Sequence, residues 1–222
     1  RFKDSKVLAI DLSLSSLAYA KRKTKELNIN NIDYMQADIL DLGNLKKQFD
    51  IIESAGVLHH MKDPMAGWQV LTDCLKPGGL MRIGLYSELA RQDIVKIREE
   101  IKQADIGSTI EEMKAFRNMM INSNEDHHKA TLQFPDCYNA SELRDLLFHV
   151  QEHRFTIPQI SKIIKDFNLE FLGFYIKDSY KRKFSRMFPE DIKNLSLDNW
   201  DQFEKDNPDS FFNMYQFWMR KK

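Results

Sequence analysis

The stretch that decides the fold of this 222-residue chain is FDIIESAGVLHHMKDP, which runs from Phe49 to Pro64. An apolar run ends at small residues, a pair of histidines follows, and Asp63 precedes Pro64 as at the start of a helix. A short apolar run with such boundaries is typical of a buried strand in a parallel sheet. The stretch therefore predicts a strand, a loop that carries both histidines, and a helix.

Strand and helix signals also flank this stretch on both sides. Residues 6–11 form an apolar run that ends at an acid, and residues 75–83 hold a Pro-Gly-Gly turn followed by another apolar run. Alternating strands and helices imply a parallel, right-handed, doubly wound sheet. We expect strands at 6–11, 32–37, 50–55 and 80–86, helices from 14 and over 64–75, and a short helical or looped crossover at 40–47.

Three segments together resemble the class I methyltransferases that use S-adenosylmethionine: VLAID at 7–11, the stretch at 49–64, and LKPGGLMRI at 75–83. The block from Tyr138 to Ile160 also resembles bacterial methyltransferases that often follow tetratricopeptide repeats. The resemblance implies an α/β fold, a three-layer Rossmann-like methyltransferase sheet with helical insertions. It also implies S-adenosyl-L-methionine as cofactor, and methyl transfer to an O or N atom of an acceptor that we expect to be a small molecule.

The resemblance places the nucleoside part of the cofactor at two strand ends. Asp11 would accept hydrogen bonds from the ribose hydroxyls, and Leu12 would lie against the adenine ring. Asp38 would accept a hydrogen bond from the adenine amino group while Ile39 packs on the ring. Each of the two acids has an ordinary alternative role as a residue that caps the following turn or helix.

The next strand end and its loop would serve the reacting part of the cofactor. Ser54, Ala55 and Gly56 are small, so the methionine part of the ligand can approach the backbone there. His59 is the candidate catalytic base, because a neutral imidazole can remove the acceptor's proton. The alternative is that a histidine of this pair packs inward and fixes the loop.

The acceptor pocket is expected to include His60, Tyr86, His149 and His153. The last two also belong to the pattern H-x-x-E-H, residues 149–153, which is the signature of a group of zinc peptidases. That distant alternative requires both histidines on one face of a continuous helix. We expect no metal at the cofactor site.

The family's first strand and its glycine-rich turn have no counterpart before Lys6. In the family's sheet order this strand lies between the strands at 7–11 and 50–55. We therefore expect those two strands to remain apart, with the first strand missing from the chain and cofactor binding weakened. A truncated, non-catalytic methyltransferase-like interaction module is the alternative to an enzyme.

The remaining sequence divides the chain into three expected parts. They are a cofactor-binding core at 1–86, truncated at its N-terminus, a helical insertion or lid at 87–168, and C-terminal strands at 169–222 that complete the sheet. Within them we expect helices at 110–121, 143–150 and 157–167, strands at 169–176 and 211–219, a solvated loop at 122–128 that includes His127 and His128, and a polar, aromatic-rich segment at 177–208.

Composition restricts the kinds of binding partner and the cellular compartment that we expect for this protein. Lys and Arg total 33 and Asp and Glu total 33, so the chain lacks the basic excess of a nucleic-acid binder. Two cysteines do not form a disulfide framework, which favours a cytoplasmic location. No apolar stretch approaches the length of a membrane span, so no membrane partner is expected.

Overall fold

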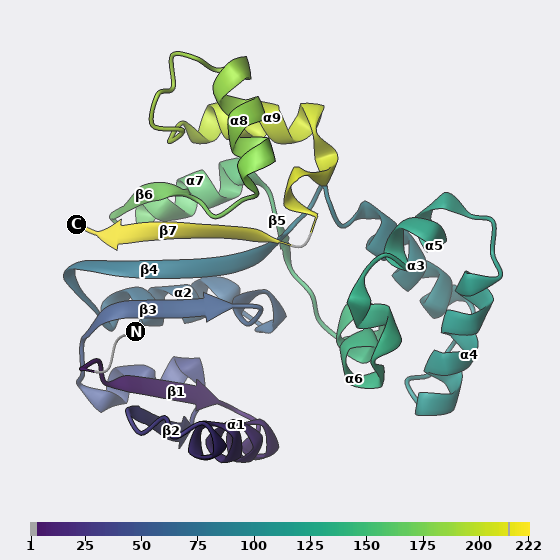
Figure 1. Cartoon of the computed structure of the whole chain (residues 1–222), viewed down its shortest axis with the longest axis horizontal. Helices are drawn as coiled ribbons and strands as arrows, with labels where there is room; N and C mark the ends of the chain where they lie inside the picture. The colour runs from purple at the N-terminus through teal and green to yellow at the C-terminus, as the bar shows by residue number, and fades with distance from the viewer. Residues whose placement is uncertain (1–3, 213) are drawn as a thin grey trace.

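The strands form two separate sheets in the computed structural model, which describes residues 4–212 and 214–222 (Figure 1). β1 (Val7–Asp11) and β2 (Ile32–Gln36) pair in parallel as a two-stranded sheet. The larger sheet has the order β3-β4-β7-β6, and β5 pairs with β4. Its strands are β3 (Phe49–Ala55), β4 (Leu75–Ser87), β5 (Arg154–Phe155), β6 (Leu169–Phe174) and β7 (Tyr215–Lys221).

The larger sheet is mixed rather than wholly parallel. β3 and β5 run parallel to β4, whereas β7 runs antiparallel to both β4 and β6. The parallel direction expected for the first four strands is confirmed within the pairs β1–β2 and β3–β4, and no direction was predicted for β7. Its alternating buried residues, Tyr215, Phe217 and Met219, predict a strand with one face in the core, but such alternation carries no information on direction.

β1 and β3 each have one edge without a strand partner among the described residues. Figure 1 shows both arrows pointing the same way, with β1 below β3. Apolar side chains of these strands are exposed, Val7 to 41% and Ile51 to 56%, although their sequences are those of buried strands. The prediction that the two strands do not pair is confirmed.

Local sequence explains where several helices begin. The side chain of Asp63 accepts hydrogen bonds from the backbone N–H groups of Met65 and Ala66, and Thr109 and Thr156 each form a capping box. The helices are α1 (Leu14–Glu26), α2 (Pro64–Asp73), α3 (Gln92–Gln103), α4 (Ile110–Ile121), α5 (Asp126–Thr131), α6 (Ala140–Leu143), α7 (Ile157–Asp166), α8 (Asp178–Met187) and α9 (Leu197–Asp206). Shorter helical turns are η1 (Ile39–Leu45), η2 (Leu58–His60), η3 (Pro135–Tyr138), η4 (Arg144–Phe148) and η5 (Pro208–Phe211).

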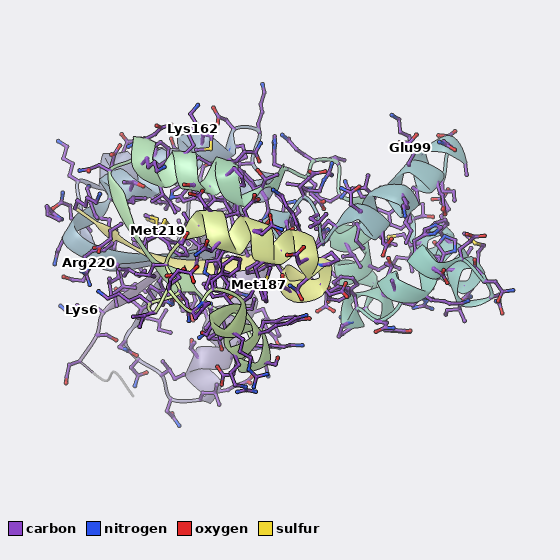
Figure 2. All side chains as sticks on the ribbon, turned by 90° about the horizontal axis from the view of Figure 1, so that it is seen from above. Lys6, Glu99, Lys162, Met187, Met219 and Arg220 are labelled. Atoms are coloured by element: carbon purple, nitrogen blue, oxygen red, sulfur yellow. The ribbon has the colours of Figure 1, made fainter. Side chains whose placement is uncertain are left out.

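The buried apolar residues form two cores. The first fills the sheet body, where Trp68, Ile83 and Phe217 are inaccessible to solvent. The second lies within the helical insertion, around Ile97 and Met120. Figure 2 shows the same two bodies from above, with Met219 in the sheet and Glu99 in the insertion. α7 packs in the first core, although its sequence falls in the segment expected to form the insertion.

Four local expectations differ from the structure. The Pro-Gly-Gly segment lies inside β4, whose pairing with β3 shifts register there, and is not a separate turn. The expected helix at 143–150 ends at Phe148, and Val150 is almost fully exposed. His127 and His128 lie in α5 and not in a solvated loop. α8 and α9 occupy the segment at 177–208, in which we expected no defined element.

Candidate functional site

The two strand-end acids lie at the same edge of the parallel strands and are partly engaged. Asp11 ends β1, and its Oδ1 accepts a hydrogen bond from the backbone N–H of Ser13 at 2.7 Å. Asp38 follows β2, and its Oδ1 accepts one from the backbone N–H of Leu40 at 2.9 Å. Both therefore act as local caps, the ordinary alternative, while one oxygen of each carboxylate has no described bond. Leu12 is 65% exposed, and Ile39 is half-buried against the first core.

The end of β3 has empty space beside its backbone and the Ser54 hydroxyl, which has no hydrogen-bond partner among the described residues. Ser54 is buried. Ala55 ends the strand, and Gly56 follows with φ of +80°. A Cβ placed on Gly56 would meet no atom within 4 Å, so there is room for a ligand beside this backbone.

A cavity of about 340 Å³ begins at Gly56 and extends to the helical insertion. Its wall combines residues of the sheet body with residues that lie at least 50 positions after Tyr86 in the chain. Three of the four residues expected in the acceptor pocket belong to this wall. The lining consists of Gly56, His60, Tyr86, Asp136, Glu142, Asp145, Leu146 and His149. Asp11 and Asp38 lie outside it.

Three carboxylates make the cavity acidic. Asp136, Glu142 and Asp145 line it from η3, α6 and η4, and none of them forms an ion pair with a described residue. Because carboxylates without paired cations attract positive charge, the cavity favours a cationic ligand. Sequence reasoning missed these residues, since only the docking of the insertion brings them to the end of β3.

Two histidines of the cavity lie against the same backbone carbonyl group. Nδ1 of His60 lies 3.0 Å from the carbonyl oxygen of Gln151, and Nδ1 of His149 lies 2.7 Å from the same oxygen. A carbonyl oxygen only accepts, so the Nδ1 of His60 carries a proton and its Nε2 presents a lone pair. Burial lowers the pKa of His60, and this keeps the imidazole neutral near pH 7.

His59 is fully buried and does not line the cavity. Neither of its ring nitrogens has a hydrogen-bond partner among the described residues. Burial, together with the nearby cationic forms of His60 and Arg91, lowers its pKa to about 3. Catalysis by His59 stays a prediction, and its burial favours the alternative in which this histidine packs inward.

The H-x-x-E-H pattern does not form the helix that a zinc peptidase requires. Residues 149–153 follow η4 without helical structure. Glu152 is instead buried between Arg91, at 2.7 Å, and Arg98, at 2.9 Å. His153 is absent from the cavity lining, and its backbone N–H donates to the carbonyl oxygen of His59 at 2.8 Å. The structural basis of the peptidase alternative is therefore wrong.

Comparison with known proteins finds a family match in the N-terminal part of the chain. Residues 1–83 match a family model described as a methyltransferase domain. The resemblance to class I S-adenosylmethionine-dependent methyltransferases is thus confirmed, and the fold is the Rossmann-like fold of that class.

Solved structures agree with this fold, and one curated protein matches the sequence. PKMT2 from Rickettsia typhi has a TM-score of 0.69 at 16% identity, over 98% of this chain and 44% of that one, and was also solved with AdoHcy. Magnesium protoporphyrin IX methyltransferase from Synechocystis, solved with bound SAH, has a TM-score of 0.51 at 11% identity, over 98% of this chain and 65% of that one. An uncharacterized protein of Synechococcus is 27% identical over 214 residues, 90% of this chain and 50% of the relative.

The chain therefore spans about half the length of the curated relative it matches. Among the described residues, no helix combines the length and the apolar character needed to cross a membrane. Cys74 and Cys137 are both free and buried, in agreement with the expectation that they form no disulfide framework. A cytoplasmic location stays a prediction.

Proposed function

We propose that this chain is part of a methyltransferase that transfers a methyl group from S-adenosylmethionine to the nitrogen of an amine acceptor. The observation that supports an amine acceptor is the acidic cavity beside Gly56. This cavity adjoins the strand end to which the resemblance assigns the methionine part of the cofactor. The same cavity disfavours anionic acceptors such as carboxylates and phosphates. It therefore favours nitrogen over oxygen as the methylated atom.

The residues at the strand ends fit the cofactor. Asp11 and Asp38 would hold the ribose and the adenine amino group through their free carboxylate oxygens, with Leu12 and Ile39 against the ring. The buried, unpartnered Oγ of Ser54 and the open space at Gly56 and Ala55 suit its amino-acid part. When bound, S-adenosylmethionine supplies an electrophilic methyl carbon on a positively charged sulfur.

The open edges of β1 and β3 support a further strand between them in the whole protein. Unpaired N–H and C=O groups on two neighbouring apolar strands are costly unless another strand covers them. The family's strand order places its first, glycine-rich strand at this position. Cofactor affinity should therefore be low in this chain and high in a longer form that supplies the strand.

The cavity residues then bind the amine and remove its proton. Asp136, Glu142 and Asp145 attract the protonated amine, and Nε2 of His60 accepts the proton that it loses. Removal of the proton by His60 would free the nitrogen lone pair for the methyl group that the bound cofactor would supply, and the electron pair of the carbon–sulfur bond would stay with the sulfur. Positioning and exclusion of water provide most of the rate enhancement.

Calorimetric titration with S-adenosylmethionine tests the cofactor assignment. We expect a longer form with a strand before Val7 to bind the cofactor, and this chain alone to bind it weakly or not at all. If neither form binds, the protein is the non-catalytic interaction module that the sequence left open as an alternative.

A transfer assay with methyl-labelled cofactor tests the acceptor class. In the longer form we expect label on small primary amines and lysine-containing peptides, and none on matched carboxylates or alcohols. Asp145→Asn should raise KM for the amine, whereas Asp166→Asn, an exposed acid of α7, should not. Label on the alcohols alone would contradict the amine assignment without affecting the cofactor assignment.

A further inference from the structure

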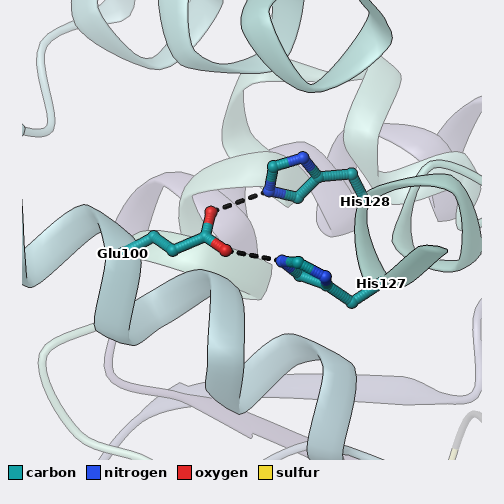
Figure 3. Close-up of side chains that lie close together, drawn as sticks. All are labelled: Glu100, His127 and His128. Atoms are coloured by element: carbon teal, nitrogen blue, oxygen red, sulfur yellow. Dashed lines mark hydrogen bonds and ion pairs between the residues drawn. The ribbon is translucent and has the colours of Figure 1, made fainter. Parts of the chain in front are cut away.

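Two consecutive histidines in the helical insertion converge on one carboxylate, and none of the three residues lines the cavity (Figure 3). Nε2 of His127 lies 2.5 Å from Oε1 of Glu100, and Nε2 of His128 lies 2.7 Å from Oε2. Glu100 belongs to α3, and both histidines belong to α5, across the connection that contains α4. One ligand atom from each residue lies within 4.8 Å of the others.

The arrangement is a built site and not a chance surface contact. The side chain of His128 is 5% exposed and that of His127 is 15% exposed, so the protein holds both rings in place. Neighbouring residues of a helix point about 100° apart, so two such rings reach one group only when it lies between them. The Glu100 side chain is 38% exposed, and this leaves one side of the cluster open to water.

We propose that Glu100, His127 and His128 form a binding site for a divalent transition-metal ion, with Zn²⁺ as the preferred ion. Two imidazole nitrogens and one carboxylate oxygen are a ligand set that zinc uses, with a water molecule in the fourth position. One ligand atom from each residue already lies within 4.8 Å of the others, and the ligands of one tetrahedral zinc ion lie roughly 3.4 Å apart, so only a small movement of the side chains is needed. Rotation of the partly exposed Glu100 side chain provides that movement.

Nitrogen ligands decide the class of metal. Mg²⁺ and Ca²⁺ prefer oxygen ligands, whereas imidazole suits Zn²⁺ and its first-row neighbours. Nδ1 of His128 has no hydrogen-bond partner among the described residues, so no protein contact prevents it from carrying the ring proton. Nε2 is then free to donate its lone pair to the metal.

A bound ion would link α3 to α5 beside the second core. Ile97 and Ile101 of α3 are buried in that core together with Met120 of α4. A metal that binds only the folded insertion stabilises it by mass action. The ion would thus be structural, and it lies outside the proposed site of methyl transfer.

Zinc binding to the whole chain tests this site, with Glu99→Gln as the matched control for Glu100→Gln. Glu99 is exposed on the same helix and bonds only to Gln103 among the described residues. After removal of metal with a chelator, we expect the wild type and Glu99→Gln to bind one Zn²⁺ per chain by calorimetry. Glu100→Gln and His127→Gln should bind it at least about 100-fold more weakly, because loss of a ligand exceeds the 10–100-fold effect of an outer-shell substitution.

Two further measurements keep the outcome decisive if a variant folds poorly. Co²⁺ added to the wild type should produce the visible absorption of a tetrahedral site, and Zn²⁺ should raise its Tm, whereas Mg²⁺ should do neither. The proposal is overturned if the wild type binds no Zn²⁺ and shows no cobalt absorption. It is also overturned if folded Glu100→Gln binds zinc as tightly as Glu99→Gln.

Discussion

The imidazole ring of His59 is stacked on the phenol ring of Tyr86, with ring centroids 3.7 Å apart and ring planes inclined by 24°. The guanidinium carbon of Arg91 lies 3.6 Å from the centre of the same phenol ring, and such short distances place it on the opposite face. Arg91 is in turn paired with buried Glu152. This stack joins the loop after β3, the end of β4 and the start of the insertion, and so fixes one wall of the cavity.

The depressed pKa of His59 predicts how stability depends on pH. The folded chain keeps this ring neutral down to a pKa of about 3, whereas the unfolded chain protonates it near pH 6.5. Between these values the unfolded state binds more protons, so stability rises with pH and is lost as pH falls from about 6.5 towards 3. Relative to His59→Leu, the wild type should show an additional slope of up to about 1.4 kcal/mol per pH unit in that window.

Urea denaturation from pH 4 to 8 measures this slope for both proteins. The comparison removes the contribution of the other titrating groups, because they are present in both. Equal slopes would show that His59 is not held neutral in the folded protein.

The buried ion pair between Arg91 and Glu152 predicts a large loss of stability when one partner is neutralised. Both side chains are 2% exposed, so Glu152→Gln leaves a buried guanidinium without its counter-charge. We expect a loss of roughly 3–5 kcal/mol in the free energy of unfolding. Glu170→Gln, in an exposed pair with Arg220 at 3.4 Å, is the control and should change it by less than about 1 kcal/mol.

Thermal and urea unfolding give both values. A loss below about 1 kcal/mol for Glu152→Gln would mean that Arg91 finds another partner or water, and that the stack does not depend on the ion pair.

Sequence periodicity predicted the elements of the sheet because each is encoded locally. The apolar runs that end at Asp11 and Ala55, and the Asp63–Pro64 helix start, need no information from elsewhere in the chain. The direction of β7 was not predicted, because alternation of buried and exposed residues does not indicate the direction of a strand. The helices α8 and α9 were not predicted, because the polar, aromatic segment at 177–208 has no simple hydrophobic period.

The site was predictable only in part, for a similar reason. His60, Tyr86 and His149 were expected in one pocket from the family's pattern, and they line one cavity. The acids Asp136, Glu142 and Asp145 were not expected in this cavity. They line it together with Gly56 only because the insertion packs against the end of β3. His127 and His128 looked like loop residues because their partner Glu100 lies 27 and 28 positions earlier, respectively.

The proposed ribose contact predicts the effect of removing the Asp11 carboxylate. In a longer form that binds cofactor, Asp11→Ala should weaken S-adenosylmethionine binding by roughly 2–3 kcal/mol, the order expected for loss of charge-assisted hydrogen bonds. Asp33→Ala, an exposed residue of neighbouring β2, should leave affinity unchanged. Calorimetric affinity for Asp11→Ala equal to wild type would exclude the ribose role of Asp11 while leaving the proposed methyl transfer intact.

The backbone conformation of Gly56 predicts a loss of stability that comes from backbone strain and not from steric crowding. Its φ of +80° lies in the left-handed region, yet a Cβ added there meets no atom within 4 Å. Gly56→Ala should therefore lower the free energy of unfolding by about 1–2 kcal/mol through backbone strain alone.

Gly43→Ala is the matched control, because Gly43 has equally open space and is not among the positive-φ glycines. There we expect no loss, or a gain of up to about 1 kcal/mol from the less flexible unfolded chain. Urea denaturation of both variants compares the two positions directly, and equal stabilities would contradict a strained backbone at the cavity's edge.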